Sequence, residues 1–139
     1  MKSLHTLIRL EKREIDVLKR QQVELQQKRE DCITALTHLA NELRAEMKSA
    51  ETMPDMRQFF GDFSAGNKKK QAQIDGLLLR TDREIEDLTQ KIRLRFNELK
   101  KFEVALENHK KREAEKFKKR ETQMMDDIAI RNYIRRDEA

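Results

Sequence analysis

The sequence is poor in the residues that usually build and close a compact globular domain. Its 139 residues include no Trp, one Tyr, one Pro, one Cys and three Gly, and only 37% are hydrophobic. Globular domains are typically about half apolar and a quarter charged, whereas 41% of these residues are charged. We therefore expect long helices that bury a narrow apolar stripe, an arrangement that does not favour an enzyme.

Long hydrophobic runs are also missing. No apolar run exceeds three residues, as in Leu77–Leu79, whereas a membrane-spanning helix needs about 20. We expect no membrane span and, from the polar opening of the sequence, no secretory signal. Cys32 has no second cysteine with which to form an intrachain disulfide or a cysteine zinc site. These absences predict a protein of the reducing cytoplasm.

Proline and glycine are concentrated in one stretch. Pro54, Gly61 and Gly66 all lie within residues 52–67, so we expect the single turn region of the chain there. Inside it, residues 54–60 could form a short helix that Gly61 ends. Ser64 or Asn67 could then cap the helix that follows.

Two long segments repeat apolar residues with the alternating spacing of a coiled coil. The first helix is expected at about 3–51 and the second at about 68–136. The expected seam of the first is Leu4, Ile8, Glu11, Ile15, Leu18, Gln22, Leu25, Arg29, Cys32, Leu36, Leu39 and Leu43. That of the second is Ile74, Leu78, Thr81, Ile85, Leu88, Ile92, Arg95, Leu99, Phe102 and Leu106.

These segments predict an all-α fold, a single domain over 1–139 that forms a two-helix antiparallel coiled-coil hairpin with a longer C-terminal helix. A turn centred near residue 59 places Leu4 opposite Ala114, so the second helix would extend about 20 residues past the first, or about 30 Å. A parallel dimer of unbroken helices is the alternative. The proline and glycines in the middle of the sequence disfavour it.

The positive charge is unevenly distributed. The net charge is +5, and the basic excess lies in the second helix. We define residues 108–120, with seven basic and two acidic side chains, as the basic band. It could meet an acidic protein surface or a phosphate backbone, or be an ordinary solvated helix face. Nucleic acid is disfavoured, because acidic residues are interspersed and no aromatic platform accompanies the band.

No constellation of catalytic residues emerges. Residues 61–68 carry two glycines at phosphate-loop spacing, but Asn67 stands where the lysine is required. His5, His38 and His109 lie more than thirty residues apart, which is not a metal-ligand spacing. We predict no catalytic activity, no metal, no cofactor and no small-molecule substrate.

The C-terminal stretch 121–136 contains several apolar residues. It lies beyond the part of the second helix that the first helix is expected to cover. Met124, Met125, Ile128, Tyr133 and Ile134 would form an exposed stripe. Amphipathic helices commonly bind in hydrophobic grooves, and methionine adapts to irregular surfaces. The alternatives are a frayed terminus or a contact between copies.

The opening residues 2–16, the two-helix layout and the ending residues 123–131 resemble the flagellar export protein family FliJ. The YscO-type stalk proteins of injectisomes are similar in architecture. The resemblance implies a non-enzymatic cytoplasmic stalk of the flagellar type III export apparatus, peripheral to the inner membrane. The implied partners are the hexameric export ATPase, the cytoplasmic domain of the export gate, and export substrates or chaperones.

The resemblance also suggests two partner-binding surfaces. One lies on the second helix: Lys110, Lys111, Arg112, Lys118, Lys119, Arg120, Met124, Met125, Ile128, Arg131, Tyr133 and Ile134. The other lies at the turn: Phe59, Phe60 and Phe63. The alternative functions are a generic coiled-coil scaffold or an injectisome YscO-type stalk protein, followed by a basic nucleic-acid binder.

Overall fold

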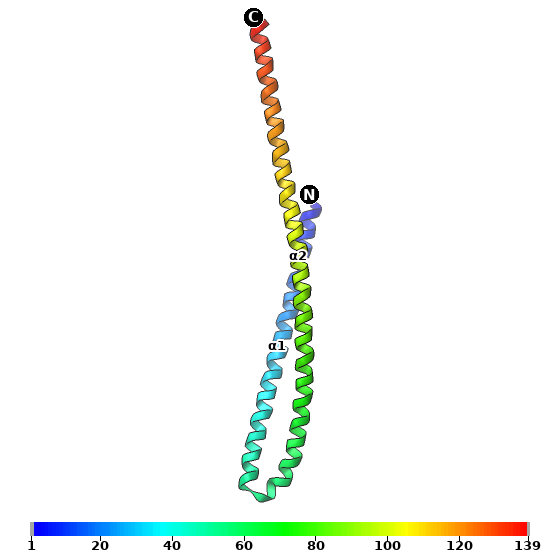
Figure 1. Ribbon diagram of the computed structural model, residues 1–139, viewed down its shortest axis with the longest axis vertical. Coiled ribbons are helices and arrows are strands. Elements are labelled where there is room, and N and C mark those ends of the chain that lie inside the picture. The colour runs from blue at the N-terminus through cyan, green and yellow to red at the C-terminus, as the bar shows by residue number, and fades with distance from the viewer. Residues whose placement is uncertain (1, 139) are drawn as a thin grey trace. The chain divides into compact units, whose positions relative to one another are not determined.

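The computed structural model describes residues 2–138 as two long helices joined by one short turn (Figure 1). Helix α1 spans Lys2–Thr52, the 3-10 helix η1 spans Pro54–Met56, and helix α2 spans Arg57–Glu138. The predicted all-α fold, with two long helices packed against each other, is confirmed. The chain divides into two compact units, Glu14–Arg95 and a second one that combines the start of α1 with α2 from Phe96 onward.

Proline chemistry explains the turn in the first of these units. The residue before a proline is disfavoured in the helical region, and Met53 is extended, with φ −126° and ψ 102°. Pro54 then begins η1, a position where its missing N–H costs nothing. The Met53 N–H donates back to the Ser49 carbonyl, and the Met56 N–H donates to the Met53 carbonyl, both at 3.1 Å. Met53 is thus the only described residue between 2 and 138 outside a helix.

The turn is shorter than the sequence suggests. A turn region was expected over 52–67 and a second helix from about 68, whereas α2 already begins at Arg57. Gly61 does not end a helix, and neither Ser64 nor Asn67 caps one, because all three lie inside α2. No glycine has a positive φ. Half-buried Phe60, Phe63 and Ser64 continue the seam towards the turn, so packing on α1 outweighs the low helix propensity of glycine.

The expected seam is the buried face of both helices. Every one of its positions in α1 is buried or half-buried, including the polar ones. In α2 all but Arg95 are buried or half-buried. Leu18 of α1 and Leu88 and Ile92 of α2 form the central cluster of the unit Glu14–Arg95, with Leu25 packed against it.

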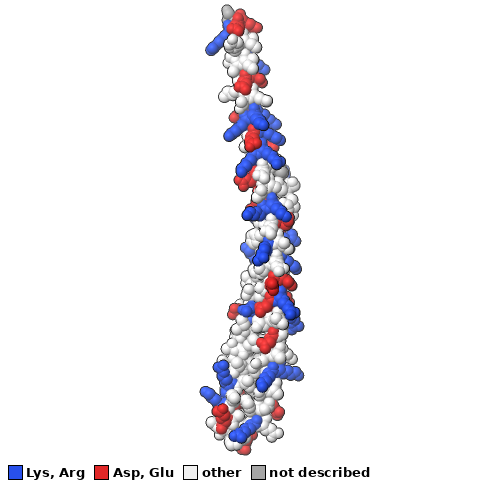
Figure 2. Space-filling view, viewed as in Figure 1, with Lys and Arg blue, Asp and Glu red and all other residues white. Residues whose placement is uncertain are grey.

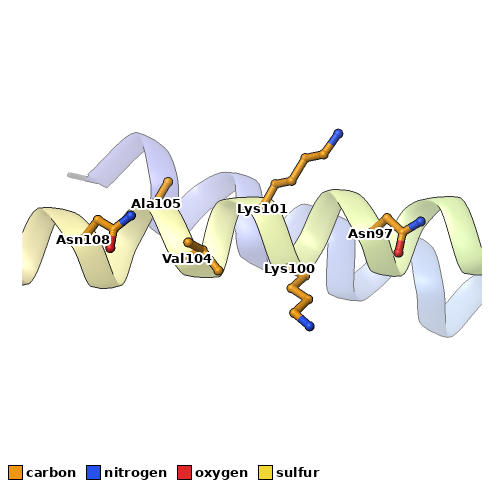
Figure 3. A pocket seen from close by; sticks show the side chains of 6 residues that line it. All are labelled: Asn97, Lys100, Lys101, Val104, Ala105 and Asn108. Atoms are coloured by element: carbon orange, nitrogen blue, oxygen red, sulfur yellow. The ribbon is translucent and has the colours of Figure 1, made fainter.

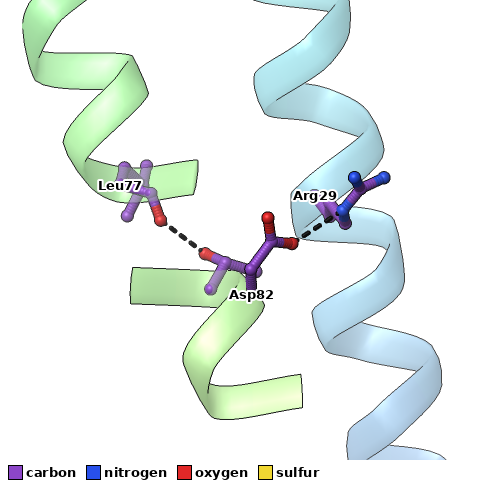
Figure 4. A network of polar contacts seen from close by, with 4 residues as sticks. Arg29, Leu77 and Asp82 are labelled. Carbon is purple, nitrogen blue, oxygen red and sulfur yellow. Dashed lines mark hydrogen bonds and ion pairs between the residues drawn. The ribbon is translucent and has the colours of Figure 1, made fainter. Parts of the chain in front are cut away.

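Polar pairs across the seam define the register. The Gln22 amide donates to the Thr89 hydroxyl at 3.3 Å, and Arg29 Nε donates to Asp82 Oδ1 at 2.7 Å (Figure 4). Both pairs are centred between Asp55 and Met56, so the expected centre near residue 59 is wrong. The observed and expected pairings of α1 with α2 differ by about one heptad. Such a shift still places apolar residues opposite each other, so periodicity alone does not detect it.

A buried amide adds a third polar connection near the turn. Asn67 is 4% exposed, and its Nδ2 donates to the Leu39 carbonyl of α1 at 2.9 Å. Gln71 Nε2 in turn donates to Asn67 Oδ1 at 2.6 Å. Asn67 therefore serves as a link between the helices.

The second unit pairs the beginning of α1 with α2 after Phe96. Leu4 and Ile8 of α1 are half-buried, Leu99 of α2 is buried, and Leu106 and His109 are half-buried. His109 is the last residue of α2 that is not exposed. Within residues 2–138, no helix is long and apolar enough to span a bilayer.

Candidate functional site

We define the distal segment as Lys110–Glu138, the part of α2 that follows the last partly buried residue. Every residue of this segment is exposed (Figure 1, yellow to red). Ala114, expected opposite Leu4, belongs to it, because the register places Leu4 opposite a residue one heptad earlier, Glu107. The unpaired part of α2 is therefore longer than the sequence suggested.

Three exposed apolar side chains of the distal segment continue the seam of α2. Phe117 follows Leu99 by eighteen residues, which is five complete turns at 3.6 residues per turn. Met124 and Ile128 lie within about 20° of the same direction. Their exposed fractions are 63% for Phe117, 64% for Met124 and 51% for Ile128. We name these three residues the distal stripe; it is the seam of a coiled coil without the second helix.

The other apolar residues of the distal segment lie elsewhere on its circumference. Ile130 and Tyr133 point about 140–160° away from the distal stripe, and Met125 and Ile134 lie to its sides. All four are at least half exposed. The single stripe expected from the sequence is therefore divided between two faces. Phe117 and Ile130 were not among the expected site residues, although the spacing of Phe117 from Leu99 indicates that Phe117 lies on the seam side of α2.

Most of the basic band lies on the flanks and back of the distal segment. Lys111 and Lys118 are one heptad apart on one side, and Arg112 and Lys119 are one heptad apart on the back. Lys110 and Arg131, by contrast, lie close to the direction of the distal stripe. In Figure 2, Lys and Arg side chains gather along the part of α2 that follows the paired region.

Two ion pairs accompany the band. Lys111 approaches Glu107, and Lys116 approaches Glu113, each at 3.9 Å between nitrogen and oxygen. All four side chains are more than half exposed, so the pairs contribute little stability. The band remains a solvated, basic surface.

The turn surface is apolar but only partly exposed at the predicted residues. Phe59 is 56% exposed, whereas Phe60 and Phe63 are half-buried on the seam side of α2. Met53 and Met56, which were not among the expected turn residues, are 57% and 41% exposed. The accessible apolar surface at the turn therefore consists mainly of Met53, Met56 and Phe59.

Depressions on the described surface are shallow. One of them, on α2 of the second unit, is lined by the Val104 and Ala105 side chains and by lysine and asparagine side chains around them (Figure 3). Lys100 and Lys101 extend away from it in opposite directions (Figure 3). No group of three His, Cys, Asp or Glu residues within 2–138 is arranged to hold a metal ion. Cys32 is buried in the seam, and residues 61–68 are helical and form no phosphate loop.

Comparison with known proteins gives a family match over nearly the whole chain. The family model described as "Flagellar FliJ protein" matches residues 1–138. Proteins of the same name from two strains of Caulobacter vibrioides, NA1000 / CB15N and ATCC 19089 / CIP 103742 / CB 15, are each 27% identical over 126 residues. The alignments cover 91% of this chain and 91% of each relative. No solved structure matches the chain.

Proposed function

We propose that this chain, which belongs to the flagellar FliJ protein family, is a non-enzymatic stalk of the flagellar protein export apparatus. In this proposal the distal segment enters the central opening of the hexameric export ATPase. The paired helices hold the segment, and the turn surface faces the cytoplasmic domain of the export gate or an export chaperone. The stalk couples these partners and stimulates ATP hydrolysis.

The observation that carries the proposal is the exposure of apolar residues on two faces of one unpaired helix. Met124 and Ile128 lie on the distal stripe, and Ile130 and Tyr133 lie on the opposite face, all between 51% and 68% exposed. A shallow groove contacts one face of a helix, whereas an opening that surrounds the helix contacts both. Burying these side chains would stabilise the complex by about 25 cal/mol for each Å² of apolar surface removed from water.

The basic band supports the same arrangement. It directly precedes the apolar end of the distal segment, the residues from Met124 onward. Its cationic side chains would therefore meet the rim of the ATPase opening when the apolar end is inside that opening. Acidic side chains on the rim would raise the association rate and orient the stalk. The contribution of such rim charges falls as salt rises.

Truncation tests the proposal. A chain that ends at Arg120 keeps the paired helices and the whole basic band but lacks the apolar residues from Met124 onward. We expect it to lose binding to the purified export ATPase and stimulation of its hydrolysis. The matched control is Val23→Gln, which removes an apolar side chain that is 69% exposed on α1 and should leave stimulation unchanged. Full stimulation by the truncated chain would refute the role given to the distal segment.

Binding to the second partner requires a separate experiment. We expect Met53→Gln combined with Phe59→Gln to weaken binding to the cytoplasmic domain of the export gate or to an export chaperone, because both side chains are exposed at the turn. The same variant should stimulate the ATPase normally. A combined loss of both activities would contradict the assignment of two surfaces.

A further inference from the structure

The distal stripe is the continuation of an interface that is already formed elsewhere in α2. Leu99 and Leu106 of the second unit are buried or half-buried where α1 is present, and Phe117, Met124 and Ile128 point in the same direction where α1 is absent. The stripe therefore has the position and spacing needed to pack against another helix in the geometry of a coiled coil. We propose that its occupant, in the free protein, is the distal segment of a second copy of this chain, arranged antiparallel.

Apolar matching favours the antiparallel alignment that uses all three residues of the distal stripe. When two distal segments are centred between Thr122 and Gln123, Phe117 of each copy lies level with Ile128 of the other. Met124 of each copy then fills the space between these two layers. The overlap runs from Lys110 to Arg135, about 39 Å of helix at 1.5 Å per residue.

Charge selects the antiparallel over the parallel direction. Parallel segments would place the two basic bands side by side, and like charges at facing positions are destabilising. In the antiparallel alignment the basic band of each copy lies level with residues 125–137 of the other, so the two bands are apart, and Lys110 and Arg135 are the like charges that still lie level on the stripe. The overlap is short and contains few apolar layers, so we expect the pair to form reversibly and only as concentration rises.

The mass of the free chain provides the first test. We expect sedimentation equilibrium to show a shift from 16.7 kDa towards twice that mass between micromolar and millimolar concentration. Phe117→Gln with Ile128→Gln should abolish the shift. Ile130→Gln with Tyr133→Gln, the matched change on the opposite face, should preserve it. All four side chains are exposed, so neither variant disturbs the paired helices; a chain that stays monomeric, or a dimer that survives the first variant, overturns the proposal.

Cross-linking tests the direction and the register. In a Cys32→Ala background, Lys110→Cys and Arg135→Cys place thiols at the two ends of the overlap, close to the direction of the stripe. A mixture of the two variants should form a disulfide-linked dimer, and each variant alone should not. Cross-linking of Lys110→Cys alone would indicate parallel pairing and would refute the alignment. Both tests use the free chain, so their failure leaves the proposed stalk function untouched.

Discussion

The buried side chain of Asn67 affects both the stability of the fold and the register of the two helices. An amide in an apolar seam must find hydrogen-bond partners, or its burial is costly. Here its Nδ2 reaches the Leu39 carbonyl, and its Oδ1 accepts from Gln71. A single polar residue in such a seam favours the register in which its partners are present.

We predict that Asn67→Ala lowers the free energy of unfolding by about 1–2 kcal/mol, since it removes the link to α1 and leaves space in the seam. Urea denaturation followed by circular dichroism measures the change. Asn97→Ala is the matched control, because Asn97 is exposed on the same helix and its replacement should change stability by less than about 0.5 kcal/mol. Equal effects of the two substitutions would show that Asn67 contributes nothing through its position.

The glycines of α2 are a second residue-level feature with a measurable consequence. A Cβ added at Gly61 or Gly66 would meet no atom within 4 Å, and neither residue has a positive φ. Packing and backbone conformation therefore do not require glycine at these positions.

We predict that Gly61→Ala and Gly66→Ala each raise the free energy of unfolding by about 0.5–1 kcal/mol, because alanine loses less backbone entropy in a helix. Thermal unfolding of the single and double variants measures the gain, which should be close to additive. A loss of stability in either variant would mean that the first turns of α2 depart from a regular helix in solution.

At the scale of the elements, the pairing of α1 with α2 in Glu14–Arg95 makes a direct geometric prediction. In a Cys32→Ala background, cysteines at positions 29 and 82 should be joined by a short thiol-reactive cross-linker, since Arg29 Nε and Asp82 Oδ1 meet across the seam at 2.7 Å. Cysteines at 29 and 89 would pair only if the register were shifted by one heptad. Peptide mapping distinguishes the two, and cross-linking of the second pair alone would overturn the register.

The same elements show which parts of the fold could be predicted from the sequence. Heptad spacing identified the buried face, from Leu4 to Leu43 in α1 and over all but Arg95 in α2, because that face depends on local periodicity. The predicted start of α2 was wrong because glycines such as Gly61 and Gly66 usually mark a turn, whereas packing on α1 keeps them helical here. The register was wrong because a seven-residue repeat looks alike after a one-heptad shift, and only the polar partners of Gln22, Arg29 and Asn67 remove that ambiguity.

The candidate site, like the fold, could be predicted only in part from the sequence. Sequence reasoning identified an unpaired apolar end and a basic band, since both follow from composition along one helix. It grouped Tyr133 with Met124, however, because it counted apolar residues without following their direction around the helix. Five helical turns separate Leu99 from Phe117, and that spacing connects the distal stripe to the seam.

At the scale of the whole molecule, little of the chain is removed from water. Its accessible surface is 11727 Å², whereas a compact monomer of this mass exposes about 7,600 Å². The buried residues of the core lie along one seam between α1 and α2. Stability should therefore depend on the paired helices and very little on the distal segment.

We predict that a chain ending at Arg120 unfolds at nearly the same urea concentration as the full chain, because residues 121–138, which it lacks, are all exposed. A chain lacking residues 2–13 should unfold at a lower concentration, since it loses half-buried Leu4 and Ile8. Urea denaturation of both chains, followed by circular dichroism, measures the contrast. A large loss in the first chain would indicate that the distal segment contacts the rest of the protein.

The absence of packing around the distal segment has a consequence for proteolysis. Tertiary contacts supply most of the stability of helices in proteins, and an unpaired helix opens locally at a small free-energy cost. The basic band thus offers trypsin a series of Lys and Arg bonds in the part of α2 that opens most readily. Brief digestion should remove the apolar end first and leave the paired helices as a resistant fragment, and a bound partner would shield the same bonds from cleavage.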